Sequence, residues 1–352
     1  MTELGQIIAA RIRAHGPITL AEYMQTCLLH PEHGYYVTRD PFGQAGDFTT
    51  APEIHQMFGE LCGLALAQAW LDQGAFAPFT LAEPGPGRGT LMADILRAVT
   101  NVPGMRQGAE VALIEASPHL RRMQRQRLGE VSHLDSLAQL PDQPLFLIAN
   151  EFFDALPIHQ FQRVADGWSE RMVGLDNGFL TLGLGPAMNL PREADLGTLV
   201  ETCPAGVAAM TAIAGRIVRH GGAAIVVDYG GWNGTGDTFQ ALRRHATDDP
   251  LAHPGEADLT AHVDFAPLAA AAIRAGAVAS KPVAQGPWLL GLGAGERAQC
   301  LTAAGDAGAA AALQRLTAAE EMGQLFKALA IWPRGAAPVP GFEALDTDAI
   351  DA

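Results

Sequence analysis

The segment Phe79-Thr-Leu-Ala-Glu-Pro-Gly-Pro-Gly-Arg-Gly-Thr90 decides the fold of this chain. Residues 79–82 form a short apolar run typical of a buried strand, and residues 91–98 have the spacing of an amphipathic helix. Between them, three glycines can adopt positive φ and let a ligand approach the backbone, while the helix N-terminus offers free N–H groups. The segment therefore predicts a strand, a glycine-rich turn and a helix that together bind a nucleotide-like ligand.

The acid before the glycines distinguishes between nucleotide cofactors. A dinucleotide fingerprint has the spacing Gly-x-Gly-x-x-Gly or Ala, whereas here Gly85, Gly87 and Gly89 alternate and Glu83 lies two residues before the first of them. A carboxylate at this position would repel a pyrophosphate, but it could hold the cationic amino-acid end of S-adenosyl-L-methionine. We therefore assign Glu83 and the three glycines to cofactor binding.

A second acid, Glu115, closes the apolar run of residues 111–114, where the two hydroxyls of a ribose would be bound. The order of strand, acid, glycine turn, helix, strand and acid favours a class I methyltransferase with S-adenosyl-L-methionine as its cofactor. A tight turn followed by two solvated acids is the alternative interpretation.

Composition limits the class of protein. The chain has 352 residues, of which 48% are apolar, and this length suits one main domain with an elaboration. No stretch approaches the ~20 apolar residues of a membrane span, so we expect no stable membrane insertion. The four cysteines form no Cys-x-x-Cys pair, and no third ligand is evident beside His30 and His33. We therefore expect no metal site.

Charge and missing motifs exclude further functions. The net charge is −15, and Lys281 and Lys327 are the only lysines, so nucleic acid is not an expected partner because its phosphates require basic patches. The acidic surface could steer a basic peptide, although ordinary solubility explains it more simply. A P-loop and a Gly-x-Ser-x-Gly elbow are both missing, which argues against ATP hydrolysis and esterase activity.

The remaining sequence predicts an α/β fold, with a mostly parallel, Rossmann-like sheet of the class I methyltransferase type. We expect four parts: an N-terminal helical region over residues 1–75, a core over residues 76–157 and 205–334, an antiparallel β-hairpin insertion over residues 158–204, and a frayed tail over residues 335–352. Alternating strand patterns and an Asn-Gly turn indicate the insertion. The passage from Tyr229 to Asp264 is expected to be a long flexible loop that borders the site.

The loop over residues 43–53 precedes a helix predicted at residues 53–70 and combines glycines, hydroxyls and acids, as functional loops often do. Thr50 and Pro52 are candidates for cofactor binding, and helix capping is an equally weighted alternative for Thr50. Further along the chain, Asp135 ends a weak third strand, and Asp135 or the adjacent Ser136 is a candidate for contact with the adenine amine of the cofactor.

Several segments together resemble the MidA family, which includes the mitochondrial complex I assembly factor 7. The matching segments are His30-Pro-Glu-His-Gly-Tyr-Tyr36, Gly46-Asp-Phe-Thr-Thr-Ala-Pro-Glu53, Glu83-Pro-Gly-Pro-Gly-Arg-Gly-Thr90, Asn150-Glu-Phe-Phe-Asp-Ala-Leu-Pro157, Asp228-Tyr-Gly230, Asp258-Leu-Thr-Ala-His-Val-Asp-Phe265 and Phe326-Lys327. They occur in order over nearly the whole chain. Pro84 departs from the leucine expected between the acid and the first glycine, which removes one backbone N–H from the turn.

The resemblance implies an S-adenosylmethionine-dependent protein-arginine methyltransferase. It further implies that the enzyme symmetrically dimethylates an arginine on a subunit of respiratory complex I during assembly. The expected partner is thus a protein substrate, and the chain could also form a homodimer. Because the sequence starts almost directly at the family's first helix, we expect a bacterial cytoplasmic protein.

Arginine methylation needs carboxylates beside the attacking nitrogen, because a guanidinium with a pKa above ~12 is protonated. Such carboxylates would bind the guanidinium, draw its charge to one nitrogen and accept a proton. Glu151 and Asp154 are the main candidates, since they follow a buried strand where doubly wound sheets bind their substrates. If the segment turns helically, both side chains project the same way. Solvated loop acids are the alternative.

Asp47, Glu53 and His262 are secondary catalytic candidates, and a structural role for His262 is an alternative. Three other functions stay open at this point. A closed pocket would favour a methyltransferase that acts on a small metabolite. Failure to transfer methyl groups would indicate a non-catalytic assembly chaperone. Tight NAD binding without affinity for S-adenosylmethionine would indicate a dehydrogenase.

Overall fold

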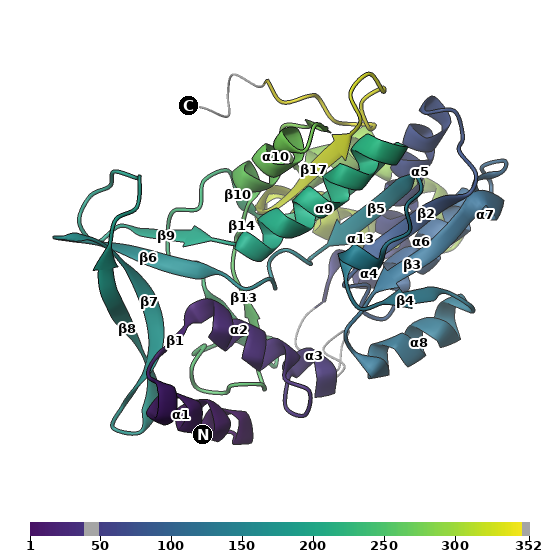
Figure 1. Cartoon of the computed structure of the whole chain (residues 1–352). Coiled ribbons are helices and arrows are strands. Elements are labelled where there is room, and N and C mark those ends of the chain that lie inside the picture. The colour runs from purple at the N-terminus through teal and green to yellow at the C-terminus, as the bar shows by residue number, and fades with distance from the viewer. Residues whose placement is uncertain (39–48, 347–352) are drawn as a thin grey trace. The chain divides into compact units, whose positions relative to one another are not determined.

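The computed structural model describes residues 1–38 and 49–346 (Figure 1). The chain forms two compact units. Unit 1 comprises Met1–Phe48, Asp154–Gly206 and Asn233–Asp264, and unit 2 comprises Thr49–Phe153, Val207–Trp232 and Phe265–Ala352. This division differs from the predicted one, because the expected N-terminal region is shared between both units.

Unit 2 is built on a mostly parallel sheet with the strand order β15-β17-β10-β5-β2-β3-β4 (Figure 1). The strands are β2 (Phe79–Pro84), β3 (Ala109–Ile114), β4 (Ser132–Leu134), β5 (Leu145–Asn150), β10 (Gly222–Gly231), β15 (Val278–Ala279), β16 (Val283–Ala284) and β17 (Phe326–Trp332). Strands β4, β3, β2, β5 and β10 pair in parallel, whereas β17 runs antiparallel to β10. The chain order reverses between β2 and β5, which is where doubly wound sheets bind ligands. The predicted fold class is confirmed.

Both faces of this sheet are buried, as a parallel sheet requires. Phe79, Leu81 and Phe146 point to one face and belong to the main core cluster. Their neighbours Ala82 and Leu147 point to the other face and are also fully buried. Continuous burial explains why these strands are apolar runs without the alternation of a half-exposed sheet.

The helices of unit 2 connect and cover these strands. They are α4 (Ala51–Ile54), α5 (Gln56–Asp72), α6 (Thr90–Val99), α7 (Met105–Gly108), α8 (Pro118–Leu128), η1 (Leu137–Gln139), α10 (Phe265–Arg274), α11 (Gln285–Gly291), α12 (Ala294–Ala303), α13 (Ala309–Thr317) and the π-helical turn η2 (Ala319–Gly323). Helix α9 (Pro204–His220) begins in unit 1 and continues in unit 2. None of the helices in the described residues is long and apolar enough to cross a membrane.

The helix predicted at residues 53–70 is instead two helices, α4 and α5, that are separated at His55. The backbone of His55 is extended, with φ −165° and ψ 143°, so the helix cannot continue through it. Its Nδ1 accepts a hydrogen bond from the N–H of Met57 at 3.1 Å and thereby caps α5. Its Nε2 contacts the Asp306 carboxylate at 3.0 Å.

The described part of unit 1 contains a larger antiparallel sheet, a smaller sheet and several helices. The strands of the larger sheet are β1 (Ile18–Thr19), β6 (His159–Val164), β7 (Gly167–Asp176), β8 (Phe179–Met188) and β9 (Leu199–Thr202), in the order β1-β7-β6-β9 with β8 on β7. Asn177 and Gly178 both have positive φ, 49° and 87°, and form the predicted hairpin turn between β7 and β8 (Figure 1). Helices α1 (Glu3–His15), α2 (Leu20–Leu29) and α3 (Tyr35–Thr38) also belong to this unit.

The passage predicted as a long flexible loop has regular structure. It forms the small sheet β12-β11-β13, with β11 (Gln240–Arg243), β12 (Ala246–Asp248) and β13 (Asp258–Thr260), followed by the short strand β14 (Val263–Asp264). The turn between β11 and β12 has positive φ at Arg244 and His245, 54° and 60°, without any glycine. Sequence inspection misses such a turn because neither residue is a usual turn former.

The segment expected to be a frayed tail is packed against unit 2 as far as residue 346. Val339 and Phe342 are buried, and the Phe342 ring lies 5.4 Å from that of Trp288. The N–H of Lys281 also donates to the carbonyl of Glu343 at 3.0 Å. Two buried apolar side chains and backbone hydrogen bonds thus hold this stretch, although proline, alanine and acids surround them.

Candidate active site

Acidic residues gather at the carboxyl edge of the parallel strands in unit 2. Glu83 lies near the end of β2, Glu115 directly follows β3, and Glu151 directly follows β5. Asp228 lies in β10, one residue beyond the pairing of Val227 with Asn150. Because these strands are parallel and adjacent, the acids of several strands share one edge of the sheet, and this edge includes the point where the strand order reverses.

The glycine turn after β2 has the predicted geometry. Gly85, Gly87 and Gly89 have φ values of 64°, 51° and 76°, a region that strongly favours glycine. A Cβ atom at Gly85 would lie 3.2 Å from the ring of Phe152, so the turn passes close to this side chain. The N–H of Gly85 donates to the carbonyl of Ile114 at 3.0 Å, so the turn stays anchored to β3 although Pro84 lacks an N–H.

Glu83 is a buried carboxylate directly before this turn. It is 3% exposed, and its Oε2 has no hydrogen-bond partner among the described residues. Burial raises its pKa to about 8, the N–H of Met92 in the first turn of α6 opposes this shift, and the charge of Glu115 adds to it. A buried acceptor without a partner, beside an open glycine turn, suits a cationic group and not a pyrophosphate. The residues therefore fit S-adenosyl-L-methionine.

The raised pKa of Glu83 predicts a pH-dependent stability that glutamine should remove. Folded Glu83 holds its proton up to about pH 8, whereas the unfolded residue ionises near its ordinary value of 4.5. Stability of the ligand-free protein should therefore fall as pH rises from about 4.5 to 8, since the unfolded state loses its proton first. When thermal unfolding is measured at several pH values, the stability of Glu83→Gln relative to the wild type should increase as pH rises over this range. A stability difference between the two proteins that does not change with pH would contradict the raised pKa of Glu83.

Glu115 is held in one position by its neighbours. It is 7% exposed, Oε1 accepts from the N–H of Ser117 at 2.7 Å, and Oε2 accepts from the amide of Gln124 at 3.1 Å. Burial raises its pKa, and these hydrogen bonds oppose the shift. Each carboxylate oxygen can still accept a further hydrogen bond, so Glu115 could hold two hydroxyl groups.

Asp135, the adenine candidate, is exposed after β4. It is joined to the end of β3 by Arg121, whose Nη2 contacts Asp135 Oδ1 at 2.6 Å and whose Nε donates to the carbonyl of Glu115 at 2.7 Å. The hydrogen bond and charge of Arg121 lower the pKa of Asp135. The structure therefore places Asp135 at the same sheet edge as Glu115, but in an ion pair.

The loop residues before α5 also lie beside the glycine turn. Thr50 is buried at the N-cap position of α4, but its side chain makes no capping hydrogen bond, and Pro52 is buried in the first turn. Glu53 accepts a hydrogen bond from Thr90 Oγ1 at the start of α6 and lies 3.8 Å from Arg88 Nη1. Asp47 lies outside the described residues.

Glu151 has the most unusual backbone of the candidate residues. Its φ is 48°, a left-handed value that costs a non-glycine residue about 1–3 kcal/mol. Its N–H donates to the carbonyl of Val227 at 2.9 Å, and its Oε1 accepts from Asn150 Nδ2 at 3.0 Å and from the N–H of Ala51 at 3.3 Å. Contacts with the adjacent Asn150 and with two distant segments, at Val227 and Ala51, thus hold the strained conformation.

Two neighbours of Glu151 were not predicted from the sequence. Asn150 is buried, and its Oδ1 has no partner among the described residues, which offers a second acceptor at this edge. Asp228 is fully buried and accepts from the N–H of Phe153 at 3.0 Å, so it supports the turn that follows Glu151. Both residues begin segments that resemble the MidA family, but the sequence assigned neither of them a role.

The helical turn that would make Glu151 and Asp154 project the same way does not form. Residues 150–154 form no helix, because the left-handed Glu151 interrupts any regular turn. Asp154 belongs to unit 1, where it is buried and its carbonyl accepts from the N–H of Ala261 at 3.0 Å. Burial is the largest cause that raises the pKa of Tyr36, and the charges of Asp258 and Asp154 raise it further.

His262 lies next to Ala261 in unit 1 and is exposed. Its backbone N–H donates to Thr238 Oγ1 at 2.9 Å. Unit 1 therefore brings Asp154 and the His262 segment together by a backbone contact. Among the described residues, no group of three or more side chains has the arrangement of a metal site.

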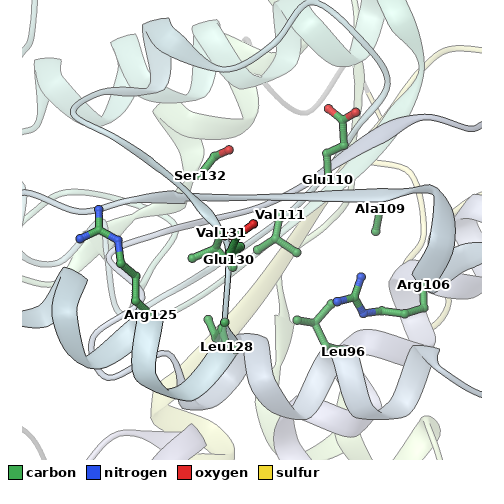
Figure 2. A pocket seen from close by; sticks show the side chains of 11 residues that line it. Leu96, Arg106, Ala109, Glu110, Val111, Arg125, Leu128, Glu130, Val131 and Ser132 are labelled. Carbon is green, nitrogen blue, oxygen red and sulfur yellow. The ribbon is translucent and has the colours of Figure 1, made fainter.

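A groove of about 870 Å³ lies elsewhere in unit 2 (Figure 2). Leu96, Val111, Leu128 and Val131 contribute apolar side chains to it, and Arg106 and Arg125 contribute guanidinium groups. It extends along the first residues of β3 and β4, whereas Glu115 and Asp135 follow the last residues of these strands. None of the candidate residues lines this groove.

Comparisons with known proteins agree with this geometry. Residues 61–283 match the model of a family described as "Putative S-adenosyl-L-methionine-dependent methyltransferase". Among curated proteins, the chain is 34% identical to the Xenopus tropicalis mitochondrial protein arginine methyltransferase NDUFAF7, over 95% of this chain and 88% of the frog protein. It is 37% identical to the human protein of the same name, over 83% of this chain and 73% of the human protein.

A solved structure is similar over almost the whole chain. It is a COG1565 superfamily member from Burkholderia thailandensis bound to S-adenosylhomocysteine, 30% identical, with a TM-score of 0.83. The similarity covers 96% of this chain and 93% of the Burkholderia chain. A demethylated form of the cofactor is thus bound by a protein with this fold.

The predicted bacterial cytoplasmic location is contradicted by the curated relatives. The frog and human proteins, and a Drosophila homolog that is 38% identical over 74% of this chain, are all named mitochondrial. The prediction rested on where the sequence begins, and the position of a first helix carries no information about the compartment. The bacterial cytoplasmic location is therefore withdrawn.

Proposed function

This chain belongs to the family of S-adenosyl-L-methionine-dependent methyltransferases, and we propose that it methylates an arginine side chain of a protein substrate. Its cofactor is S-adenosyl-L-methionine. The relatives named protein arginine methyltransferase, which are 34–38% identical, support arginine as the acceptor. The observation in this chain that carries the proposal is Glu151, an acid held in a strained conformation at the sheet edge.

The assigned role of Glu151 is to bind and deprotonate the substrate guanidinium. Bound S-adenosyl-L-methionine supplies an electrophilic methyl group on a positively charged sulfur. As the arginine nitrogen took the methyl group and the S–C bond broke, Glu151 would accept the proton displaced from that nitrogen. The remaining thioether would be neutral, so the site would need no acid beside the cofactor sulfur. A carboxylate near the nitrogen contributes typically 10²–10⁴-fold to such a step.

The backbone strain at Glu151 supports this role because it directs the carboxylate. An extended residue after β5 would continue the strand direction, whereas φ of 48° turns the chain at the sheet edge. The N–H of Ala51 and the amide of Asn150 both donate to Oε1 and keep the carboxylate oriented. Strained residues of this kind cluster at functional sites. Asp154, His262 and Asp47 stay secondary candidates.

We assign cofactor binding to the glycine turn and its two acids. Glu83 would neutralise the cationic amino-acid end, and Gly85, Gly87 and Gly89 would let it approach the backbone. Glu115 would bind the ribose hydroxyls, and Asp135, Thr50 and Pro52 complete the proposed set. The buried Oε2 of Glu83, which has no partner among the described residues, is the feature that best fits a cationic ligand.

The proposed substrate is a subunit of respiratory complex I, with symmetric dimethylation of one arginine during assembly. The resemblance to the MidA family supports this extension. The experiment is to incubate the purified chain with a methyl-labelled donor and lysate proteins, and then to hydrolyse the labelled protein. Label in symmetric dimethylarginine supports the proposal. Label in small molecules would indicate a metabolite methyltransferase, and a lack of transfer despite cofactor binding would indicate a chaperone.

A further inference from the structure

Gln124 in α8 connects the two parts of the proposed cofactor site in unit 2. It is fully buried, and its Nε2 donates to the carbonyl of Gly87 at 2.7 Å and to Glu115 Oε2 at 3.1 Å. A carbonyl and a carboxylate can only accept hydrogen bonds, so the amide nitrogen must face them. Its Cγ would also lie 3.4 Å from a Cβ at Gly89, so the side chain packs along the glycine turn.

His133 in β4 fixes the orientation of this amide. Its Nε2 lies 2.8 Å from Gln124 Oε1, and because that oxygen only accepts, Nε2 must carry the proton. The other ring nitrogen, Nδ1, is buried and has no hydrogen-bond partner among the described residues. Burial, followed by the charges of Arg125 and Arg121, lowers the pKa of His133, which keeps the ring neutral. The hydrogen bonds therefore run in one direction, from His133 through Gln124 to Gly87 and Glu115.

We propose that Gln124, oriented by His133, is a positioning residue that sets Glu115 and the glycine turn for the ribose of the cofactor. It acts through Gly87 and Glu115 and need not touch the ligand itself. The inference rests on the ribose role proposed for Glu115. Without the amide of Gln124, the buried Oε2 of Glu115 loses a hydrogen-bond donor. The carboxylate is then free to turn away from the ligand.

Helix packing alone does not explain this side chain. An apolar residue would fill the same buried position in α8 without the cost of removing an amide from water. The amide instead makes three hydrogen bonds, and two of its partners are residues assigned to the cofactor site. A side chain that serves only packing would not need partners in the glycine turn and at the end of β3.

The test replaces Gln124 with methionine, which keeps the length of the side chain and removes both donors. By calorimetry, S-adenosylhomocysteine should bind roughly ten- to hundredfold more weakly to Gln124→Met, since a lost hydrogen bond to a charged group has about this effect. Gln126→Met is the matched control, because Gln126 is exposed on the same helix. It should bind the ligand as the wild type does.

The 2′-deoxy analogue of S-adenosylhomocysteine separates positioning from general weakening. The wild type should prefer the parent compound by about tenfold or more, and Gln124→Met should reduce this preference to about threefold or less. His133→Phe should partly reduce this preference for the parent compound. If Gln124→Met does not fold, the same measurement on His133→Phe tests the inference.

Three results would overturn the inference. Gln124→Met could bind both ligands equally more weakly and keep the preference for the parent compound, or it could bind them as the wild type does. The third result is a wild type that shows no preference between S-adenosylhomocysteine and its 2′-deoxy analogue. Methyl transfer is not measured in this experiment. If the chain proved not to methylate arginine, the binding results expected for the two ligands would therefore stay the same.

Discussion

Glu151→Gln is expected to lower the rate of methyl transfer by about 10³-fold, while the affinity for S-adenosylhomocysteine stays within about threefold of the wild type. Glutamine keeps the shape of the side chain, and its carbonyl oxygen can still accept from the N–H of Ala51 and the amide of Asn150. It cannot accept the proton that leaves the guanidinium. The loss should therefore fall on the chemical step and not on cofactor binding.

The measurement is a single-turnover assay with labelled donor and the methylated protein, together with calorimetry of S-adenosylhomocysteine. Glu130→Gln is a suitable control, because Glu130 is exposed and lines the groove at the first residues of β3 and β4, at the opposite end of these strands from Glu115 and Asp135. The control should be fully active. If Glu151→Gln transfers methyl groups at the wild-type rate, Glu151 is not the base. If it also loses the cofactor, its role is in binding.

Glu83→Gln should have the largest effect on cofactor affinity. We expect roughly hundredfold weaker binding of S-adenosylhomocysteine, since a buried carboxylate that neutralises a cation is replaced by a neutral amide. The amide oxygen can still accept from the N–H of Met92, so this hydrogen bond to the first turn of α6 is kept and the fold should be preserved. The effect is thus expected in binding and not in the amount of folded protein.

The wild type should also bind S-adenosylhomocysteine more tightly as pH rises from about 6 to 8, because the cationic group of the ligand favours ionised Glu83. Glu83 releases a proton on binding, so the calorimetric enthalpy should depend on the buffer that takes up this proton. Glu83→Gln should show neither effect. Glu110→Gln serves as the control, since this acid is exposed at the start of β3. Equal affinity of wild type and Glu83→Gln would refute the selection of a cationic cofactor by this acid.

The sheet and the glycine turn were predictable because their signals are local. Residues 79–90 contain a strand, an acid, alternating glycines and a helix start in one short segment, and the structure keeps that order. The hairpin at Asn177-Gly178 is equally local, since both residues tolerate positive φ. Such features depend on neighbours in sequence and need no knowledge of the tertiary structure.

Features that depend on distant residues were not predictable. The break between α4 and α5 arises at His55, which bonds Met57 and also reaches Asp306 in a remote segment. The left-handed φ of Glu151 is held by Val227 and Ala51, neither of which is close in sequence. The packing of Val339 and Phe342 likewise needs Trp288 as a partner.

The candidate site was predicted as a set of acids, but its supporting residues were missed. Gln124 sits among arginines and glutamines in α8, and only its burial beside Gly87 and Glu115 distinguishes it from Gln126. Asn150 was quoted as part of a motif without a role, although its amide orients Glu151. A single sequence shows which residues can do chemistry, but not which residues hold them in place.

Mass-spectrometric localisation of the transferred methyl group tests the central claim most directly. The purified chain and its Glu151→Gln variant would each be incubated with deuterated methyl donor and complex I subunits, and the products fragmented. We expect two labelled methyl groups on the guanidinium nitrogens of one arginine with the wild type, and almost none with the variant. Label on a lysine, a carboxylate or a free metabolite, or equal arginine label from both proteins, would contradict it.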